Sequence, residues 1–380
     1  MSIRTLWLKA HLWVGLAIAL PLIVVALSGS VLVFEDALDR ALNPALSFVT
    51  PGNRPMPLDE IVSRVKAAYP DALLSSFSFP EQPHLALQIA ASAKPQGPFA
   101  IAVDQYTGQV LGTRSAADRE AGLARRIHLL HTRLFAGQVG EWIVGLITAL
   151  TLFMAIAGLV LWWPRKIVTI KRSASARRIN FDLHNVFGFY ASAVFLFIAL
   201  TGMLISFEAW TDPLLMRLNE TTVPPLARDS TPIAGATPIG ADALAKAAQA
   251  ALPGAFLKGI GIPNGGKGVI VALMKYPEDR TPGGRSRVAL DQYSGQVLTV
   301  VNTRMAPAGT RLINLKRSAH TGDIFGAATR ALYFVTCLML AGQVVTGFLI
   351  WWRRRASFAA TTIPALRASR VDPATELRRE

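Results

Sequence analysis

Four runs without a charged residue constrain the fold of this chain more than any other feature. They cover residues 12–34, 142–163, 185–207 and 331–352, so each run holds 22 or 23 residues. About 20 apolar residues in an α-helix cross the hydrocarbon core of a bilayer, and over this length only a helix satisfies its own backbone there. The sequence therefore predicts four transmembrane helices. Buried helices of a soluble protein and a cleaved leader are the weaker interpretations, the latter because Glu35 follows the first run where a cleavage site needs small residues.

Basic residues are concentrated next to these runs. Residues 1–11, 164–184 and 353–380 contain 15 Lys and Arg but only four Asp and Glu, in a chain of net charge +15. Segments of this kind lie in the cytoplasm. We therefore expect an inner-membrane protein of a bacterium, with both termini in the cytoplasm and both long connections in the periplasm. Because the basic residues flank the spans in the lipid bilayer instead of covering one folded surface, we expect no nucleic-acid partner.

The chain repeats one unit of span, outer module and span. The sequence D-Q-Y-T-G-Q-V-L at residues 104–111 returns as D-Q-Y-S-G-Q-V-L at residues 291–298. The Trp-Trp pair at the end of the second run returns at the end of the fourth. So many aligned identities indicate an internal duplication.

Each long connection predicts a small α+β module. Helical spacing extends over residues 58–69 and 240–252. Short strands are predicted at residues 74–79 and 85–90, and again at 256–262 and 269–275, and each set continues into a D-Q-Y-[ST]-G hairpin. The predicted fold class is thus a four-transmembrane-helix bundle with two small periplasmic α+β modules. Its predicted parts are spans at residues 1–35, 126–164, 181–208 and 316–353, modules at 36–125 and 209–315, a cytoplasmic loop at 165–180 and a cytoplasmic tail at 354–380.

Four of the six histidines align in pairs across the repeat. His11 aligns with His184 at the cytoplasmic ends of spans one and three, and His131 aligns with His320 just before spans two and four. Ionisable residues at membrane depth usually mark a function, and paired imidazoles are typical axial ligands of haem iron. We therefore predict two haem b groups, one held by each pair. Zinc or copper held by imidazole is the alternative, and the single cysteine, Cys337, excludes c-type attachment.

Glycines follow the first pair of histidines at helical spacing. Gly15 and Gly188 come four residues after their histidines, and Gly29 and Gly202 come 18 residues after, so all lie on the histidine face. This face leaves room for a flat macrocycle, although close helix packing gives the same pattern. The predicted partners of the haem propionates are basic residues near the ligands, for which snorkelling to the membrane surface is the alternative. They are Arg4, Lys9 and Arg178 on the inner side and Arg133 and Arg317 on the outer side.

The outer histidines require a bend in the chain. A straight helix from His131 to Trp163 would be about 48 Å long, which would place the two haems far apart. Glycines follow both outer histidines, so we expect the chain to bend there and return the histidines to the outer membrane face. These glycines are Gly137 and Gly140 in the first unit and Gly322 and Gly326 in the second.

Taken together, these motifs resemble the PepSY-associated transmembrane helix family. They are the H-x-x-x-G starts of spans one and three, the H-T before spans two and four, the closing G-x-x-x-W-W and the repeated hairpins. Within the family the layout is similar to the FoxB-type siderophore reductases. The resemblance implies two periplasmic PepSY modules, b-type haems and reduction of ferric siderophore iron, of the hydroxamate type, to ferrous iron. It assigns no catalytic residue.

The electron donor is expected to be a separate molecule. The loop at residues 165–180 is too short for a flavin or nicotinamide domain, so electrons would come from a cytoplasmic reductase or from a membrane quinol. Two other functions remain open from the sequence. One is a non-enzymatic PepSY membrane protein that binds or regulates a periplasmic partner, and the other is a transporter of iron or its chelate.

Overall fold

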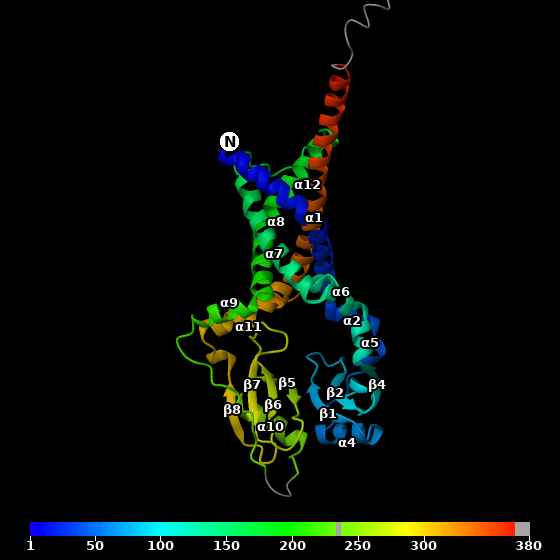
Figure 1. Ribbon diagram of the computed structural model, residues 1–380. Helices are drawn as coiled ribbons and strands as arrows, with labels where there is room; N and C mark the ends of the chain where they lie inside the picture. The colour runs from blue at the N-terminus through cyan, green and yellow to red at the C-terminus, as the bar shows by residue number, and fades with distance from the viewer. Residues whose placement is uncertain (233–236, 369–380) are drawn as a thin grey trace, which may run out of the picture. The chain divides into compact units, whose positions relative to one another are not determined.

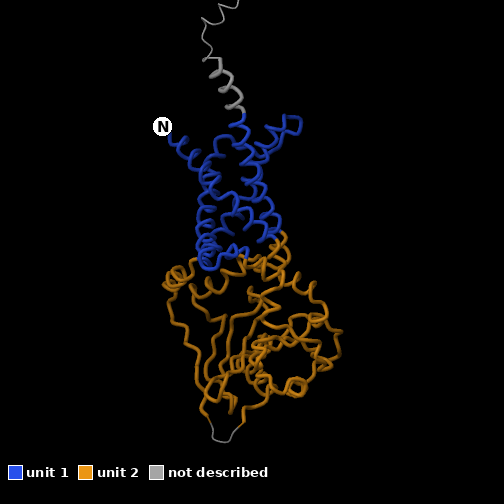
Figure 2. The backbone as a smooth tube through the Cα atoms, turned by 45° about the vertical axis from the view of Figure 1, so that its right-hand side comes forward, with its two compact units in different colours: residues 1–30, 130–206, 332–380 blue, residues 31–129, 207–331 orange. Residues whose placement is uncertain are grey.

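The computed structural model describes residues 1–232 and 237–368 (Figure 1). They form two compact units, which Figure 2 distinguishes by colour. The first, here the helical unit, contains residues 1–30 and 130–206 and the chain from residue 332 onward. The second, here the sheet unit, contains residues 31–129 and 207–331. Of the predicted cytoplasmic tail, residues 369–380 lie outside the described residues.

Four long apolar helices cover nearly all of the four uncharged runs. They are α1 (Ile3–Leu32), α7 (Gly137–Trp162), α8 (Ala176–Ser206) and α12 (Ala327–Ala368). Each has the length and hydropathy needed to cross a membrane, which confirms the prediction of four candidate spans. Large apolar side chains cover the outside of these helices, and Leu20 for example is 76% exposed, as expected of a surface that meets lipid rather than water.

The chain breaks sharply before the second span, as the glycines predicted. Helix α6 (Leu123–Arg133) carries His131 and ends seven residues before Gly140. Leu134 and Phe135 between the two helices have positive φ angles of 46° and 57°, which side-chain-bearing residues seldom adopt. A Cβ atom at Gly140 would overlap the carbonyl group of Arg133, so the return of the chain requires glycine at that position.

A second break precedes the fourth span. Helix α11 (Ala308–Thr321) ends at Gly322, whose φ of 81° is left-handed, and Gly326 with a φ of 67° leads into α12. Arg330 donates a hydrogen bond of 2.8 Å from Nε to Asp323 between these glycines. The predicted bend after His320 is therefore present. Gly322 ends the helix because glycine, which has no Cβ atom, adopts the left-handed conformation without a steric penalty.

The two predicted modules share one antiparallel sheet of eight strands. In the first connection the strands are β1 (Leu73–Ser78), β2 (Leu87–Ala93), β3 (Gly97–Val103) and β4 (Val110–Ser115), and in the second they are β5 (Phe256–Gly261), β6 (Ile270–Lys275), β7 (Ser286–Leu290) and β8 (Val297–Val301). Their order is β4-β3-β2-β1-β5-β6-β7-β8 (Figure 1). The sequence predicted each set of strands, but not that β1 and β5 pair and join them.

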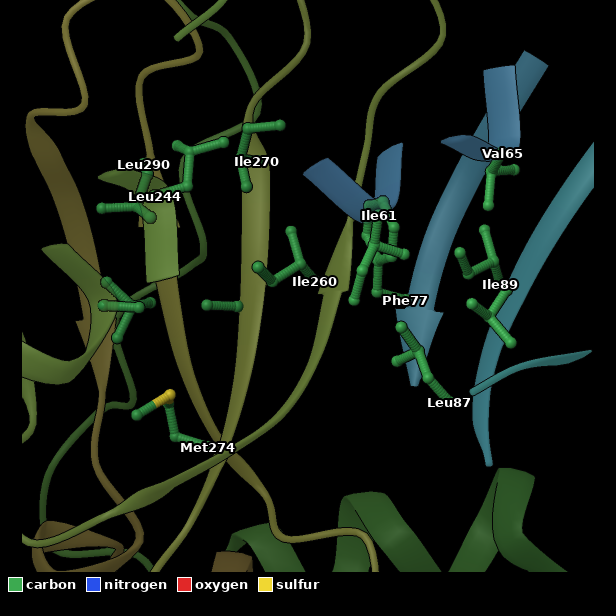
Figure 3. Close-up of a cluster of buried hydrophobic side chains, with 14 of the residues drawn as sticks. Ile61, Val65, Phe77, Leu87, Ile89, Leu244, Ile260, Ile270, Met274 and Leu290 are labelled. Carbon is green, nitrogen blue, oxygen red and sulfur yellow. The ribbon is translucent and has the colours of Figure 1, made fainter. Parts of the chain in front are cut away.

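Two helices cover one face of this sheet and close a single core. They are α4 (Leu58–Ala68) and α10 (Ala241–Ala251), each of which buries an apolar stripe against the strands. Figure 3 shows Ile61 of α4 beside Phe77 and Ile260, which face each other across the β1–β5 pair. The remaining helices are α2 (Glu35–Leu42), α3 (Pro44–Ser47), α5 (Ala116–Ala121) and α9 (Glu208–Met216), with 3₁₀ turns at Thr303–Met305 and Asp323–Phe325.

Helices α4 and α10 cap each other. The carboxylate of Asp242 accepts hydrogen bonds from the backbone N–H groups of Leu58 (2.9 Å) and Asp59 (3.0 Å). In return, Oδ1 of Asp59 accepts a hydrogen bond of 2.6 Å from the N–H of Ala241. A carboxylate at a helix N-terminus satisfies unpaired N–H groups and opposes the helix dipole. These bonds tie the two halves of the sheet unit together at a second place, away from the β1–β5 pair.

Loss of either cap should weaken the sheet unit. We expect Asp242→Ala to lower its free energy of unfolding by about 1–2 kcal/mol, and Asp59→Ala to cost about 1 kcal/mol because it accepts one bond fewer. Urea-dependent pulse proteolysis of the full chain measures both changes. Asp71→Ala, at an exposed turn, serves as the control. Equal stability of Asp242→Ala and the control would show that the reciprocal caps contribute nothing.

The repeated D-Q-Y-[ST]-G motif holds its own hairpin together. Asp104 accepts hydrogen bonds of 2.8 Å from the N–H of Tyr106 and from the hydroxyl of Thr107. The amide of Gln105 donates to the carbonyl oxygen of Leu85 over 2.9 Å. In the second copy Asp291 and Gln292 make the corresponding bonds. The side chains of the motif are used within the fold, so the motif identifies an architecture and not a ligand site.

The second copy of the motif makes stability depend on pH. Backbone hydrogen bonds from Ser294, Thr231 and Tyr293 lower the pKa of Asp291 from its ordinary value of 3.8 to about 2. The stabilisation is therefore complete above the unfolded-state pKa and is lost as the pH falls through about 2. We expect the unfolding temperature of the full chain to fall between about pH 4 and pH 2, and to fall less in Asp291→Asn. Parallel curves for the two proteins would contradict this assignment.

Candidate functional site

His11 and His184 meet inside the helical unit. His11 lies on α1 and His184 on α8, and their ring centroids are 6.4 Å apart with the ring planes at 85°. In a metal–imidazole bond of about 2.0–2.1 Å the ring centroid stands about 3.1–3.2 Å from the metal. Two imidazoles on opposite sides of one ion therefore have centroids about 6.3 Å apart. The distance between these rings would therefore allow both imidazoles to hold one metal ion.

Thr346 of α12 fixes the tautomer of His184. Its Oγ1 lies 3.0 Å from Nδ1 of His184 and donates its own proton to the carbonyl oxygen of Gly342 over 2.8 Å. A hydroxyl has one proton, so Oγ1 accepts the hydrogen bond from His184 and Nδ1 carries the proton. The lone pair of the ring is then on Nε2. A ring nitrogen that donates to a neighbouring group is the usual second-sphere arrangement of a metal-bound histidine.

His11 lacks the corresponding partner. Its Nδ1 is buried and has no hydrogen-bond partner among the described residues. In the repeat the position of Thr346 corresponds to Ala157, which has no hydroxyl. A buried ring nitrogen without a partner costs about 1–3 kcal/mol and calls for an explanation. Coordination of the His11 imidazole to a metal would provide one, so both histidines fit a bis-imidazole site.

Glycines on the neighbouring spans lie next to these two imidazoles. A Cβ atom at Gly158 of α7 would lie 3.5 Å from Cε1 of His11, and one at Gly347 of α12 would lie 3.1 Å from Cε1 of His184. The two glycines occupy equivalent positions in the repeat. The sequence shows this alignment, but it does not show that the two glycines lie next to the imidazoles of His11 and His184.

The glycines predicted to face the macrocycle have other neighbours. A Cβ atom at Gly15 would meet Cε of Met154 at 2.9 Å, and one at Gly188 would meet the amide of Gln343 at 2.9 Å. These two positions therefore allow close helix packing. Gly202 is buried in α8.

His131 lies against the outer part of α1. Its Nδ1 is 2.9 Å from the carbonyl oxygen of Val25 and 3.3 Å from Oγ of Ser28. A carbonyl oxygen only accepts, so Nδ1 donates and the lone pair of the ring is on Nε2, as in His184. A Cβ atom at Gly29 would stand 2.9 Å from Cε1 of His131. His320 lies in the last turn of α11, within the sheet unit, and its pairing with His131 stays a prediction.

The basic residues predicted near the haem edges have protein partners or lie at the surface. Nε of Arg178 donates to the fully buried carboxylate of Asp182 over 2.8 Å. Arg133 pairs with Glu141 at 3.4 Å. The other three, all exposed, are Arg4 and Lys9 on α1 and Arg317 on α11. His128, for which the sequence suggested no role, lies 3.3 Å from the carboxylate of Glu35.

Comparison with known proteins adds the family. A family model described as PepSY-associated TM region matches residues 8–354, which is most of the chain. No curated protein matches it. Within residues 1–232 and 237–368 no three His, Cys, Asp or Glu side chains gather as a metal-binding cluster.

Proposed function

The chain belongs to the PepSY-associated TM family, and from that premise we propose that it is a di-haem membrane oxidoreductase that reduces ferric siderophore iron to ferrous iron. The observation that carries the proposal is the pair His11 and His184, whose centroids are 6.4 Å apart within the helical unit. Two imidazoles with no further protein ligand would be sufficient to hold the iron of a haem. Bound haem b would supply one-electron transfer at each pair.

The proposed arrangement follows the charges of the sequence. We place the protein in a bacterial inner membrane with both termini in the cytoplasm and the sheet unit in the periplasm. The sheet unit then comprises two PepSY modules that arose by internal duplication. His11 and His184 would hold the inner haem, and His131 and His320 would hold the outer one.

The residues of the chain orient and shield these sites. Thr346 keeps the His184 ring in one orientation and one tautomer, and the Val25 carbonyl does the same for His131. The apolar helix surfaces around them keep water away from the imidazoles. Glycines in contact with the rings, Gly158, Gly347 and Gly29, remove the side chains that would fill the space beside them.

The substrate is a ferric hydroxamate at the periplasmic face. Its iron(III) accepts one electron and becomes iron(II), for which hard oxygen donors have much lower affinity, so reduction alone releases the metal. The electron originates from a separate cytoplasmic reductase or a membrane quinol, because the loop between α7 and α8 has no room for a donor domain.

Reaction of the reduced protein with a ferric chelate tests this function. The full chain, purified in nanodiscs and reduced with dithionite that is then removed, is mixed under argon with a ferric hydroxamate and an iron(II)-trapping dye. We expect haem reoxidation and dye formation in equal amounts, and neither with the gallium(III) chelate, which has the same shape but accepts no electron. Reduced protein that stays reduced with the ferric chelate would reject the function, and a colourless protein would favour the non-enzymatic alternative.

The Thr346 hydroxyl should contribute to cofactor retention. Thr346→Val keeps the shape of the side chain but removes the acceptor for His184, and loss of such a partner typically lowers affinity about 10–100-fold. We expect faster transfer of haem to an apo-globin acceptor and a shifted reduction midpoint. Thr336→Val, a buried site elsewhere on α12, is the matched control and should behave as wild type.

A further inference from the structure

Five arginines converge on one cavity of the helical unit. The cavity has a volume of about 320 Å³ and lies where the chain connects α7 to α8 and where α12 leaves the bundle. Its basic lining consists of Arg165, Arg177, Arg178, Arg353 and Arg354. No Asp or Glu lines it. Like charges around a shared cavity repel one another, and a bound anion relieves that repulsion.

Three of these arginines have no counter-charge in the described part of the chain. Arg178 is bonded to Asp182, and the guanidinium of Arg165 lies 5.8 Å from the ring centroid of Phe181. For Arg177, Arg353 and Arg354 the described residues offer no carboxylate at ion-pair distance. Side chains with five fixed N–H donors each and no acceptor are suited to an anion with several oxygens, such as a phosphate.

The cavity and the histidine site lie at different positions along α8 and α12. Arg177 precedes His184 by seven residues on α8, which is about 10 Å along the helix. Arg353 follows Gly347, the glycine in contact with His184, by six residues on α12, or about 9 Å. Both arginines are thus displaced toward the same end of the bundle, where the uncharged runs stop. This is the depth at which lipid headgroups meet membrane helices.

We propose that this cavity binds the phosphodiester headgroup of an anionic phospholipid. Phe181 and Ile350 provide an apolar wall next to the arginines, so the site matches a molecule that is charged at one end and apolar at the other. Basic pockets between membrane helices bind anionic headgroups through this combination. Lipid would anchor the start of α8 to the part of α12 around Arg353. The proposal needs no haem, because it rests on the arginines of the cavity and not on the histidine pair.

Native mass spectrometry of the full chain with added lipid tests the proposal. The protein is titrated in detergent with phosphatidylglycerol and, separately, with phosphatidylcholine, which has no net charge. We expect one phosphatidylglycerol bound per chain at low lipid excess, with affinity that falls as salt is raised. The double variant Arg353→Gln/Arg354→Gln should bind it about 30-fold more weakly. Arg355→Gln is the matched control, because Arg355 does not line the cavity and lies over the ring of Trp351 at 5.3 Å.

Two further measurements separate the possible anions. A thermal-shift titration with inorganic phosphate should give no stabilisation at millimolar concentrations. If phosphate stabilises the protein as much as phosphatidylglycerol does, the ligand of the cavity is free phosphate and the lipid proposal is wrong. Haem content per chain should be unchanged in the double variant. A loss of haem with unaltered lipid binding would assign the arginines to the haem carboxylates and overturn the proposal, as would equal lipid binding by the double variant and Arg355→Gln.

Discussion

We expect His11→Ala and His184→Ala each to remove about half of the haem bound per chain, because under the proposed di-haem function each would leave the inner site with one imidazole and would not alter the proposed outer pair. The pyridine haemochrome assay, normalised to protein, measures this loss, and the Soret band should weaken in proportion. The physical reason is the same for both residues. Their ring centroids are 6.4 Å apart, so each ring would supply one of the two imidazoles of the inner site.

The control for this experiment is His84→Ala. His84 lies in the sheet unit, where its ring stacks on Phe48 at 6.0 Å, and its loss should leave the haem content unchanged. His11→Met tests whether a weaker haem ligand at the same place retains the cofactor with a changed spectrum, which separates loss of a ligand from loss of the fold. Full haem content in both alanine variants would disprove the assignment of the inner pair.

Phe77→Ala will destabilise the sheet unit by about 3–5 kcal/mol, the usual cost of a cavity at a buried aromatic residue. Phe77 is 1% exposed and belongs to β1, the strand that pairs with both β2 and β5. It faces Ile260 across the β1–β5 pair and packs against Ile61 of α4 (Figure 3). A cavity there weakens both halves of the core at once, so we expect a single unfolding transition at lower urea concentration.

Leu73→Ala is the matched control on the same strand. Leu73 is 67% exposed, so its truncation removes little buried surface and should change stability by less than about 0.5 kcal/mol. Urea-dependent pulse proteolysis of the full chain compares the two variants. Two separate transitions in Phe77→Ala would show that the halves of the sheet unfold independently, and a cost similar to that of Leu73→Ala would show that the shared core is not continuous there.

The features that the sequence predicts well are those set by local chemistry. A bilayer admits only long apolar helices, so the uncharged runs identify α1, α7, α8 and α12 without any knowledge of their neighbours. The bends follow in the same way from Gly140, where a Cβ atom would overlap the carbonyl group of Arg133, and from Gly322, whose left-handed backbone favours glycine. The hairpins follow from the D-Q-Y-[ST]-G motif.

The features that it misses depend on contacts between distant segments. The pairing of β1 with β5 joins strands about 180 residues apart, and each strand alone only reveals its buried face. The same holds for the reciprocal caps of Asp59 and Asp242. Helical periodicity placed Gly15 on the face of His11, but the neighbour of that face is Met154, and the glycine that meets the imidazole comes from α7. Thr346 is part of the site only because α12 packs against α8.

The pairing of β1 with β5 also means that β1 is synthesised long before the strand with which it pairs. At about 5–20 residues per second, some 10–40 seconds pass between synthesis of the first strand and of its partner. During that interval the nascent half-sheet presents an open row of backbone donors and acceptors, the kind of edge that recruits foreign strands. We therefore expect this edge to be protected during biogenesis, either by a holding chaperone or by rapid arrival of the later strands.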